Sequence, residues 1–158
     1  MPTQPPLFTP GHPVYFGGSR SPALAAPHAA AIAQAVYAAA VACCPVHVGC
    51  QFGVDALVIK SALAAGAPLV IFCVAGSLSS APAHVRAAAA VGASVHLAAG
   101  GSSAPIPARF LLRSLAAAAG SQCALFFVPG AGSLAVIRRL SCPVIVLAGA
   151  GPSQPSLF

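Results

Sequence analysis

The chain has 158 residues, of which 58% are hydrophobic and only 5% are charged, with 7 Lys and Arg against a single acidic side chain. This length predicts one domain with one core. Because Asp55 is the one carboxylate side chain and Glu is absent, the composition excludes glycosidase chemistry that needs two carboxylates, and it excludes carboxylate cages for Mg²⁺ or Ca²⁺.

The apolar composition raises the question of a membrane span. The longest uncharged stretch, residues 21–54, is interrupted by proline, histidine and glutamine, and most of its other residues are alanine. The N-terminus has neither the basic nor the apolar region of a signal peptide. We therefore expect a cytoplasmic protein with no membrane partner and six reduced cysteines. No CxxC pair is present, so we expect neither a metal nor a cofactor.

Short apolar runs alternate with alanine-rich segments along the chain. The runs are rich in β-branched and aromatic residues and predict six strands, at 14–16, 46–48, 69–74, 95–97, 124–128 and 144–147. The segments between them are rich in Ala and Leu and predict five helices, near 22–43, 54–66, 82–92, 107–119 and 131–140. The proline-rich residues 1–12 and the residues 149–158 predict flexible ends, which leaves a single domain over 13–148.

The predicted strands are continuous apolar runs rather than alternating ones. Such strands are typical of a parallel sheet that is covered on both faces. The alternation of strand and helix then gives right-handed crossovers. The sequence therefore predicts an α/β fold with a Rossmann-like, doubly wound, mainly parallel six-stranded sheet and helices on both faces.

The turns after five of these strands are rich in glycine and serine. In a doubly wound sheet, ligands bind at the carboxyl ends of the strands. Glycine lets the backbone approach a ligand, serine supplies a hydroxyl, and the next helix adds the positive end of its dipole. Each glycine alone also fits the steric needs of a tight turn. Several such turns, with Arg20 in the first, favour an anionic ligand, and none matches a P-loop or a GxGxxG turn.

Three further residues carry candidate chemistry. Arg109 and Arg113 are four residues apart and share one face of a predicted helix, which faces either the cleft or solvent. Asp55 lies at a predicted helix start, where it caps the helix, accepts hydrogen bonds from a ribose or an amine, or does both. His47 and His96 lie inside predicted strands and are interpreted as structural, and no catalytic triad is visible.

Three segments together resemble one family. The strand and turn at 13–22 resemble the opening G-S-R turn of the DprA/Smf and LOG proteins, which belong to the SLOG superfamily of Rossmann-like nucleotide-binding domains. Residues 48–56 are similar to the G-x-x-x-G-[IV]-D-x-x-A turn and helix of DprA. Arg113-Ser114 and the segment 124–133 are similar to the R-N helix start and the P-G-G-x-G-T loop of the family. The resemblance covers residues 13–148 and implies a nucleotide-binding fold.

The departures from the family pattern shape the functional expectation. LOG enzymes carry a catalytic Glu after the last loop, whereas this chain continues with Leu134 and contains no Glu. We therefore expect a non-catalytic protein that binds a nucleotide or a nucleotide-derived phosphate. The expected ligand-binding residues lie in the glycine-rich turns and on the helix at 107–119, and they are Gly17, Gly18, Ser19, Arg20, Gly49, Gln51, Gly53, Asp55, Arg109, Arg113, Ser114, Gly130, Gly132 and Ser133.

Two alternative functions stay open. The resemblance to DprA implies binding of single-stranded DNA, which the net charge of +6 favours and the low aromatic content of 6% disfavours. The resemblance to LOG proteins implies a nucleoside 5'-monophosphate phosphoribohydrolase, an N-glycosidase in which Asp55 would be the catalytic carboxylate. In each case we expect a homo-oligomer, because so apolar a surface is costly to leave in water.

Overall fold

The computed structural model describes residues 8–101 and 103–147 of the chain. Its strands are β1 (Val14–Gly18), β2 (Val46–Val48), β3 (Leu69–Phe72), β4 (Ser94–His96), β5 (Cys123–Phe127) and β6 (Val144–Leu147). Its helices are α1 (Pro22–Ala25), α2 (Ala29–Val41), α3 (Val54–Ala65), α4 (Ala83–Ala90), α5 (Ile106–Ala118) and α6 (Ala131–Ile137), with short 3-10 turns η1 (Ala26–His28) and η2 (Leu78–Ser80).

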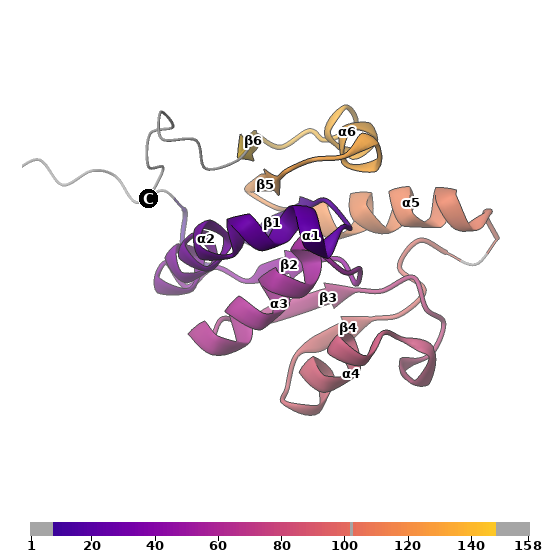
Figure 1. Cartoon of the computed structure of the whole chain (residues 1–158), viewed down its shortest axis with the longest axis horizontal. Coiled ribbons are helices and arrows are strands. Elements are labelled where there is room, and N and C mark those ends of the chain that lie inside the picture. The colour runs from indigo at the N-terminus through magenta and orange to yellow at the C-terminus, as the bar shows by residue number, and fades with distance from the viewer. Residues whose placement is uncertain (1–7, 102, 148–158) are drawn as a thin grey trace, which may run out of the picture.

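The strands form one sheet in the order β4-β3-β2-β1-β5-β6 (Figure 1). Every strand pair within the described residues is parallel, and β1 lies between β2 and β5. The chain moves outward from β1 to β4, crosses back through α5 to β5 on the other side of β1, and ends at β6. The predicted Rossmann-like, doubly wound sheet is therefore confirmed, and it is wholly rather than mainly parallel.

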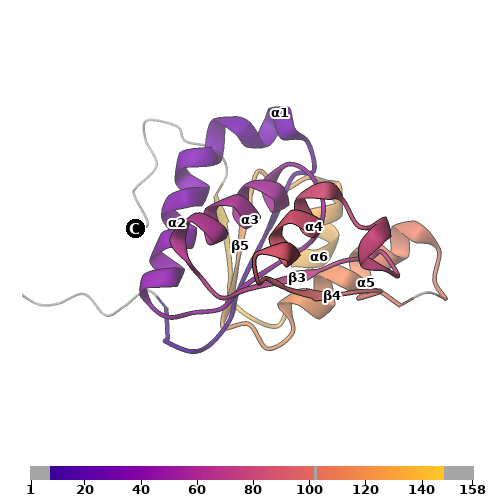
Figure 2. The same ribbon diagram turned by 90° about the horizontal axis from the view of Figure 1, so that it is seen from below.

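Helices cover both faces of this sheet (Figure 2). On one face, buried residues of α2, α3 and α4 join Val14 and Phe16 in the larger apolar core. On the other face, Tyr15 and Phe126 pack with buried residues of α5 and α6. Because successive side chains of a strand point to opposite faces, β1 contributes to both cores. This double burial explains why the strands are continuous apolar runs in the sequence.

The first predicted helix, near 22–43, is divided into α1, the 3-10 turn η1 and α2. Pro27 lies in η1, where its ring is tolerated but does not continue a regular helix. The combined segment Pro22–Val41 is long and apolar enough to cross a membrane by length and composition. Here, its inner residues Ile32 and Val36 are fully buried in the core of the domain, as in a helix that packs on a sheet.

The chain begins to pack before the expected domain start at residue 13. Phe8 is buried in the core, and the amide of Gln122 bonds to both Thr9 and His12. Residues 8–12 are therefore held against the start of β5. The remaining residues of the two ends that were predicted to be flexible, 1–7 and 149–158, lie outside the described residues.

Candidate anion-binding site at the carboxyl edge of the sheet

A cavity of about 290 Å³ lies at the carboxyl ends of the central strands. The chain order reverses between β1 and β5, and such a switch point is where doubly wound sheets bind ligands. We call this space the switch-point cavity. It is lined by Tyr15, Gly18, Arg20, Gln51, Asp55, Pro107, Phe110, Leu111, Arg113, Ser114, Phe126, Gly132, Ser133, Ala135 and Val136.

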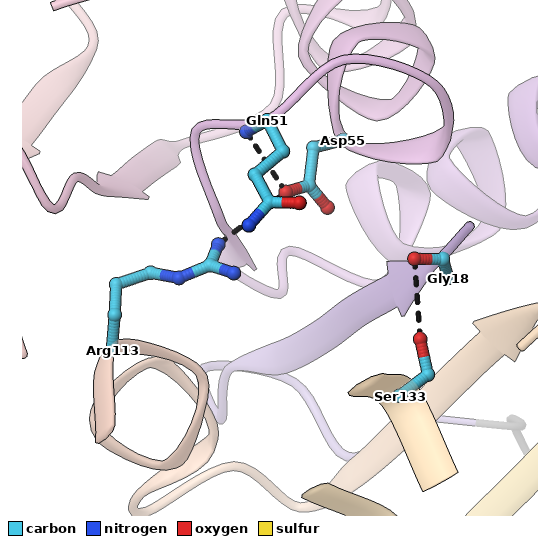
Figure 3. Close-up of polar contacts among 5 residues, drawn as sticks. All are labelled: Gly18, Gln51, Asp55, Arg113 and Ser133. Atoms are coloured by element: carbon cyan, nitrogen blue, oxygen red, sulfur yellow. Dashed lines mark hydrogen bonds and ion pairs between the residues drawn. The ribbon is translucent and has the colours of Figure 1, made fainter. Parts of the chain in front are cut away.

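Asp55 and Arg113, which both line the switch-point cavity, form a buried ion pair (Figure 3). Nη1 of Arg113 on α5 lies 3.3 Å from Oδ2 of Asp55 in the first turn of α3. The same Oδ2 accepts a hydrogen bond of 3.1 Å from the backbone N–H of Gln51. Asp55 and Arg113 are only 6% and 4% exposed. The carboxylate therefore ties the turn after β2 to α5, and it does not cap the free N–H groups of its own helix.

Gly49 makes room for this ion pair. A Cβ atom added at Gly49 would lie 1.2 Å from Nη1 of Arg113 and 2.6 Å from Oδ2 of Asp55. Any side chain at this position would therefore displace the guanidinium. Gly49 lets the Arg113 side chain lie against the backbone, and the ligand contact expected of Gly49 from the sequence stays a prediction.

The charge of Arg113 is stabilised within the fold. Burial acts to lower the pKa of the guanidinium, but the carboxylate of Asp55, with smaller contributions from Tyr15 and Cys50, raises the pKa above its usual value. Nε of Arg113 is buried and has no hydrogen-bond partner in the structure. A buried N–H without a partner is costly, so the side chain has a donor to offer to a ligand.

The second arginine of the cavity, Arg20, lies in the turn after β1 and is exposed. Its guanidinium carbon lies 5.3 Å from the ring centre of Phe110, and that of Arg113 lies 5.9 Å from the same ring. These distances are within the range of cation–π attraction. Phe110 therefore helps to hold both guanidinium groups at one cavity.

Hydroxyl groups complete the polar lining of the switch-point cavity. The hydroxyl of Ser133 donates a hydrogen bond of 3.2 Å to the carbonyl oxygen of Gly18, which joins the turns after β5 and β1 (Figure 3). Tyr15 and Ser114 both line this cavity, and burial raises the pKa of the Tyr15 hydroxyl. The Tyr15 hydroxyl therefore stays protonated at neutral pH, whereas the O–H of Ser133 is already donated to Gly18.

A second space, which we call the apolar cavity, lies beside the first and has a volume of about 390 Å³. The two cavities share Arg20, Gln51 and Phe110. The rest of the second lining is Cys50, Phe52, Cys73, Val74, Ala75, Ser80 and Pro82. The first cavity is lined by both arginines and the second mainly by apolar side chains, so a charged space and an apolar space lie side by side.

Eight of the residues expected to bind a ligand line the switch-point cavity, namely Gly18, Arg20, Gln51, Asp55, Arg113, Ser114, Gly132 and Ser133. Others lie behind it. An added Cβ on Gly17 would meet the ring of Phe126, and one on Gly53 would meet the backbone of Ser19. The hydroxyl of Ser19 accepts a hydrogen bond from the N–H of Ser21.

Arg109 does not share the setting of Arg113, although both lie on α5. Nε of Arg109 donates a hydrogen bond of 2.6 Å to the carbonyl oxygen of Ala104 in the preceding loop. Gly130 precedes α6 as its N-cap. Among the described residues, neither Arg109 nor Gly130 belongs to the lining of the switch-point cavity.

Sequence reasoning missed the aromatic part of the site. Tyr15 and Phe126 line the switch-point cavity from strands in which every residue is apolar or small. The alternation of faces in β1 was a usable signal for Tyr15, because it sets this residue opposite Val14 and Phe16. The spacing of three residues between Phe110 and Arg113 on one helix was a signal for Phe110.

The chemistry available at this site is recognition of an anion. Two guanidinium groups and several hydroxyls converge on the switch-point cavity, whereas the one carboxylate is already bound twice. Within residues 8–101 and 103–147, no cluster of three or more His, Cys, Asp or Glu side chains is placed to hold a metal ion.

The fold places the chain in the class of Rossmann-like α/β proteins with a sheet that is parallel throughout. A solved structure, DNA processing protein A (DprA) from Streptococcus pneumoniae, is similar to it with a TM-score of 0.67 and 20% sequence identity. The match covers 90% of this chain and 51% of the DprA chain, so the chain spans about half the length of that neighbour. No family model matches the sequence, and no curated protein matches it.

Proposed function

We propose that the protein binds a nucleotide, or a phosphate-bearing nucleotide derivative, in the switch-point cavity without converting it. The flat apolar part of the ligand would extend into the apolar cavity, and its phosphate would lie near Arg20 and Arg113. Both arginines line the switch-point cavity. Hydrogen bonds from arginine to phosphate are charge-assisted and are frequently bidentate.

The pairing of the single acidic side chain carries this proposal. Asp55 is the one Asp or Glu of the chain, and it is bound to Arg113. Arg20 at the same cavity therefore has no side-chain carboxylate to pair with. The two arginines and one carboxylate leave a net positive charge at the site, which an anion from solution would neutralise. The unpartnered Nε of Arg113 adds a second donor.

Calorimetric titration with AMP, ADP, cyclic AMP and ADP-ribose tests this function, with inorganic phosphate as a comparison. We expect at least one nucleotide to bind, and Arg20→Ala to weaken its affinity by roughly 10-fold or more, since a hydrogen bond to a charged group contributes about 1.5–3 kcal/mol. Arg86→Ala is the matched control, because Arg86 is exposed on α4 and the variant loses the same charge. Absence of binding, or equal affinity in Arg20→Ala and the parent, would contradict the proposal.

Single-stranded DNA is the second candidate ligand, favoured by two aromatic side chains near Arg20. Phe52 is 59% exposed and Phe110 is half-buried, so bases have rings on which to stack. The neighbour DprA is named a DNA processing protein. A gel shift with an oligonucleotide, repeated with free nucleotide as competitor, separates the candidates. Competition by the mononucleotide favours the nucleotide site, and a shift that persists favours DNA.

Hydrolysis of a nucleotide N-glycosidic bond is supported least. Asp55, the candidate catalytic residue for that activity, accepts two hydrogen bonds through Oδ2 and is 6% exposed. This placement suits the orientation of Arg113 better than the abstraction of a proton. Incubation with AMP followed by chromatography for free adenine tests the activity, and release that persists in Asp55→Asn would show that Asp55 is not its catalytic residue.

A further inference from the structure

The carboxylate of Asp55 uses only one of its oxygens within the protein. Both of its hydrogen bonds, from the backbone N–H of Gln51 and from Nη1 of Arg113, end on Oδ2. Within residues 8–101 and 103–147, Oδ1 has no hydrogen-bond partner, and it is not one of the buried polar atoms that lack a partner. Because Asp55 lines the switch-point cavity, Oδ1 is open to that cavity. Figure 3 shows it turned away from Arg113.

The open oxygen sets a chemical requirement on the ligand. A carboxylate oxygen accepts hydrogen bonds and donates none, whereas the guanidinium groups of Arg20 and Arg113 at the same cavity only donate. A ligand that displaces water from the cavity therefore has to place a donor at Oδ1 and an anionic acceptor at the arginines. A phosphate group alone does not meet this requirement, because its charged oxygens would repel the carboxylate.

The donor of a nucleotide that meets Oδ1 is either a sugar hydroxyl or an amino group of the base. Among the described residues, Asp55 is not part of the lining of the apolar cavity, where the base is proposed to lie. Oδ1 belongs to the same carboxylate as the oxygen 3.3 Å from Nη1 of Arg113, so its donor lies close to the proposed phosphate contact. In a nucleotide, the ribose joins the phosphate to the base, and its hydroxyls are therefore the donors in this position.

We propose that a ribose hydroxyl of the ligand donates a hydrogen bond to Oδ1 of Asp55, so that the switch-point cavity selects free ribonucleotides. This inference rests on the proposed function and adds recognition of the sugar to it. An internal nucleotide of a DNA strand has no free sugar hydroxyl, because its 2' carbon carries only hydrogen and its 3' oxygen is esterified. A DNA strand in the cavity would therefore leave Oδ1 buried without a donor, which is costly.

Calorimetric titration of the full chain with AMP, 2'-deoxy-AMP and 3'-deoxy-AMP, and with the same three forms of ADP, tests the inference. We expect removal of at least one of the two hydroxyls to weaken the affinity by roughly 10-fold or more, which is the effect of losing one hydrogen bond to a charged group. Equal affinity for the ribose form and for both deoxy forms would overturn this inference and leave the proposed function standing. Failure of both AMP and ADP to bind would also overturn it, whereas the proposed function fails only if cyclic AMP and ADP-ribose do not bind either.

The variant Asp55→Asn assigns the discrimination to the carboxylate. Two N–H groups donate to Oδ2, so the amide oxygen of asparagine is needed at that position and the amide nitrogen takes the place of Oδ1. The sugar hydroxyl then loses its charged acceptor. We expect the ratio of the affinities for the ribose and deoxy forms to fall by roughly 5-fold or more, in protein whose folding is checked by circular dichroism. An unchanged ratio in the folded variant would overturn the inference.

The variant Gln51→Ala is the matched comparison and does not depend on the folding of Asp55→Asn. Gln51 also lines the switch-point cavity and carries a neutral acceptor oxygen. The substitution removes this oxygen but keeps the backbone N–H that bonds to Oδ2 of Asp55. Whatever its effect on the affinity itself, Gln51→Ala should leave the ratio of the ribose and deoxy affinities as in the parent. Loss of the discrimination in this variant would identify Gln51 as the sugar contact and overturn the assignment to Asp55.

Discussion

The carboxylate of Asp55 joins two parts of the chain that are far apart in sequence. Its partners are the backbone N–H of Gln51 and the guanidinium of Arg113 on α5. A buried ion pair adds little net stability when it is compared with apolar residues of the same shape, because both charges lose their hydration. Removal of only one of the two charged side chains is costly, since the remaining charge stays buried without a partner.

Removal of one partner should therefore harm the fold more than removal of both. We expect Asp55→Asn to lower the free energy of unfolding by about 3 kcal/mol. The double variant Asp55→Asn with Arg113→Met should lose clearly less than the sum of the two single variants, because no unpaired charge remains. Urea denaturation followed by circular dichroism measures all four proteins. Strictly additive losses would show that the two side chains are not energetically coupled.

A second residue-scale prediction concerns backbone strain after β4. Ala98 has a φ of 49°, in the left-handed region, where a Cβ atom costs roughly 1–2 kcal/mol. Ala98→Gly should relieve this strain and raise the free energy of unfolding by about 0.5–1 kcal/mol, after the entropy gained by the unfolded chain is subtracted. The control Ala89→Gly lies within α4 and should lower stability by about 1 kcal/mol. Thermal unfolding compares the variants, and a loss of stability in Ala98→Gly would contradict the strain argument.

At the scale of elements, the sequence predicted the strands and helices well. Strands that are buried on both faces of a sheet appear as continuous apolar runs, which can be recognised in a short stretch of sequence. The division of the first helix at Pro27 and the packing of Phe8 were not predicted, since both depend on how the segment lies against the sheet. The ion pair of Asp55 and Arg113 could not be predicted from neighbouring residues either, because its partners are 58 positions apart in the sequence. The two residues meet because the crossover through α5 returns the chain beside β1.

The contact between α5 and the sheet includes a titratable group. Nδ1 of His47 on β2 lies 3.1 Å from the carbonyl oxygen of Ala117 on α5, and burial lowers the pKa of this histidine. The unfolded chain, with a histidine pKa near 6.5, therefore holds more protons than the folded chain just below that pH. The neutral His47 therefore makes its full contribution to the free energy of unfolding above about pH 6.5, and this contribution decreases as the pH falls toward the folded-state pKa.

We expect His47→Gln to weaken this pH dependence. Urea denaturation at about pH 7.5 and at about pH 5 gives the loss of stability on acidification, and the loss should be smaller in the variant than in the parent because one proton-linked group is gone. His12→Gln, at an exposed position, is the control and should behave as the parent. An unchanged loss in His47→Gln would mean that another group causes the acid sensitivity.

At the scale of the whole molecule, α2 has an unusual outer face. The helix contains Gln34 as its one polar residue, and Tyr37 and Val41 on its outer side are 62% and 64% exposed. A helix that is apolar all round is normally buried on all sides. We therefore propose that this face mediates the self-association expected from the composition.

Light scattering of the parent should show an oligomer at micromolar concentration. The double variant Tyr37→Lys with Val41→Lys should shift the protein toward the monomer, because two buried charges in the contact would be strongly unfavourable. Leu112→Lys, a substitution of an exposed apolar residue on α5, is the control and should leave the assembly unchanged. A monomeric parent would contradict the proposed interface.

The central position of β1 has a consequence for synthesis on the ribosome. The first 96 residues of the chain contain β1 to β4, which pair with one another in a continuous series. The other edge of β1 pairs with β5, so Val14 has no partner on this edge until Cys123 has been synthesised. Until then, the nascent chain presents an unpaired, wholly apolar strand edge, which is a template for pairing with other chains. We therefore expect the nascent chain to be most prone to pairing with other chains before β5 has been made.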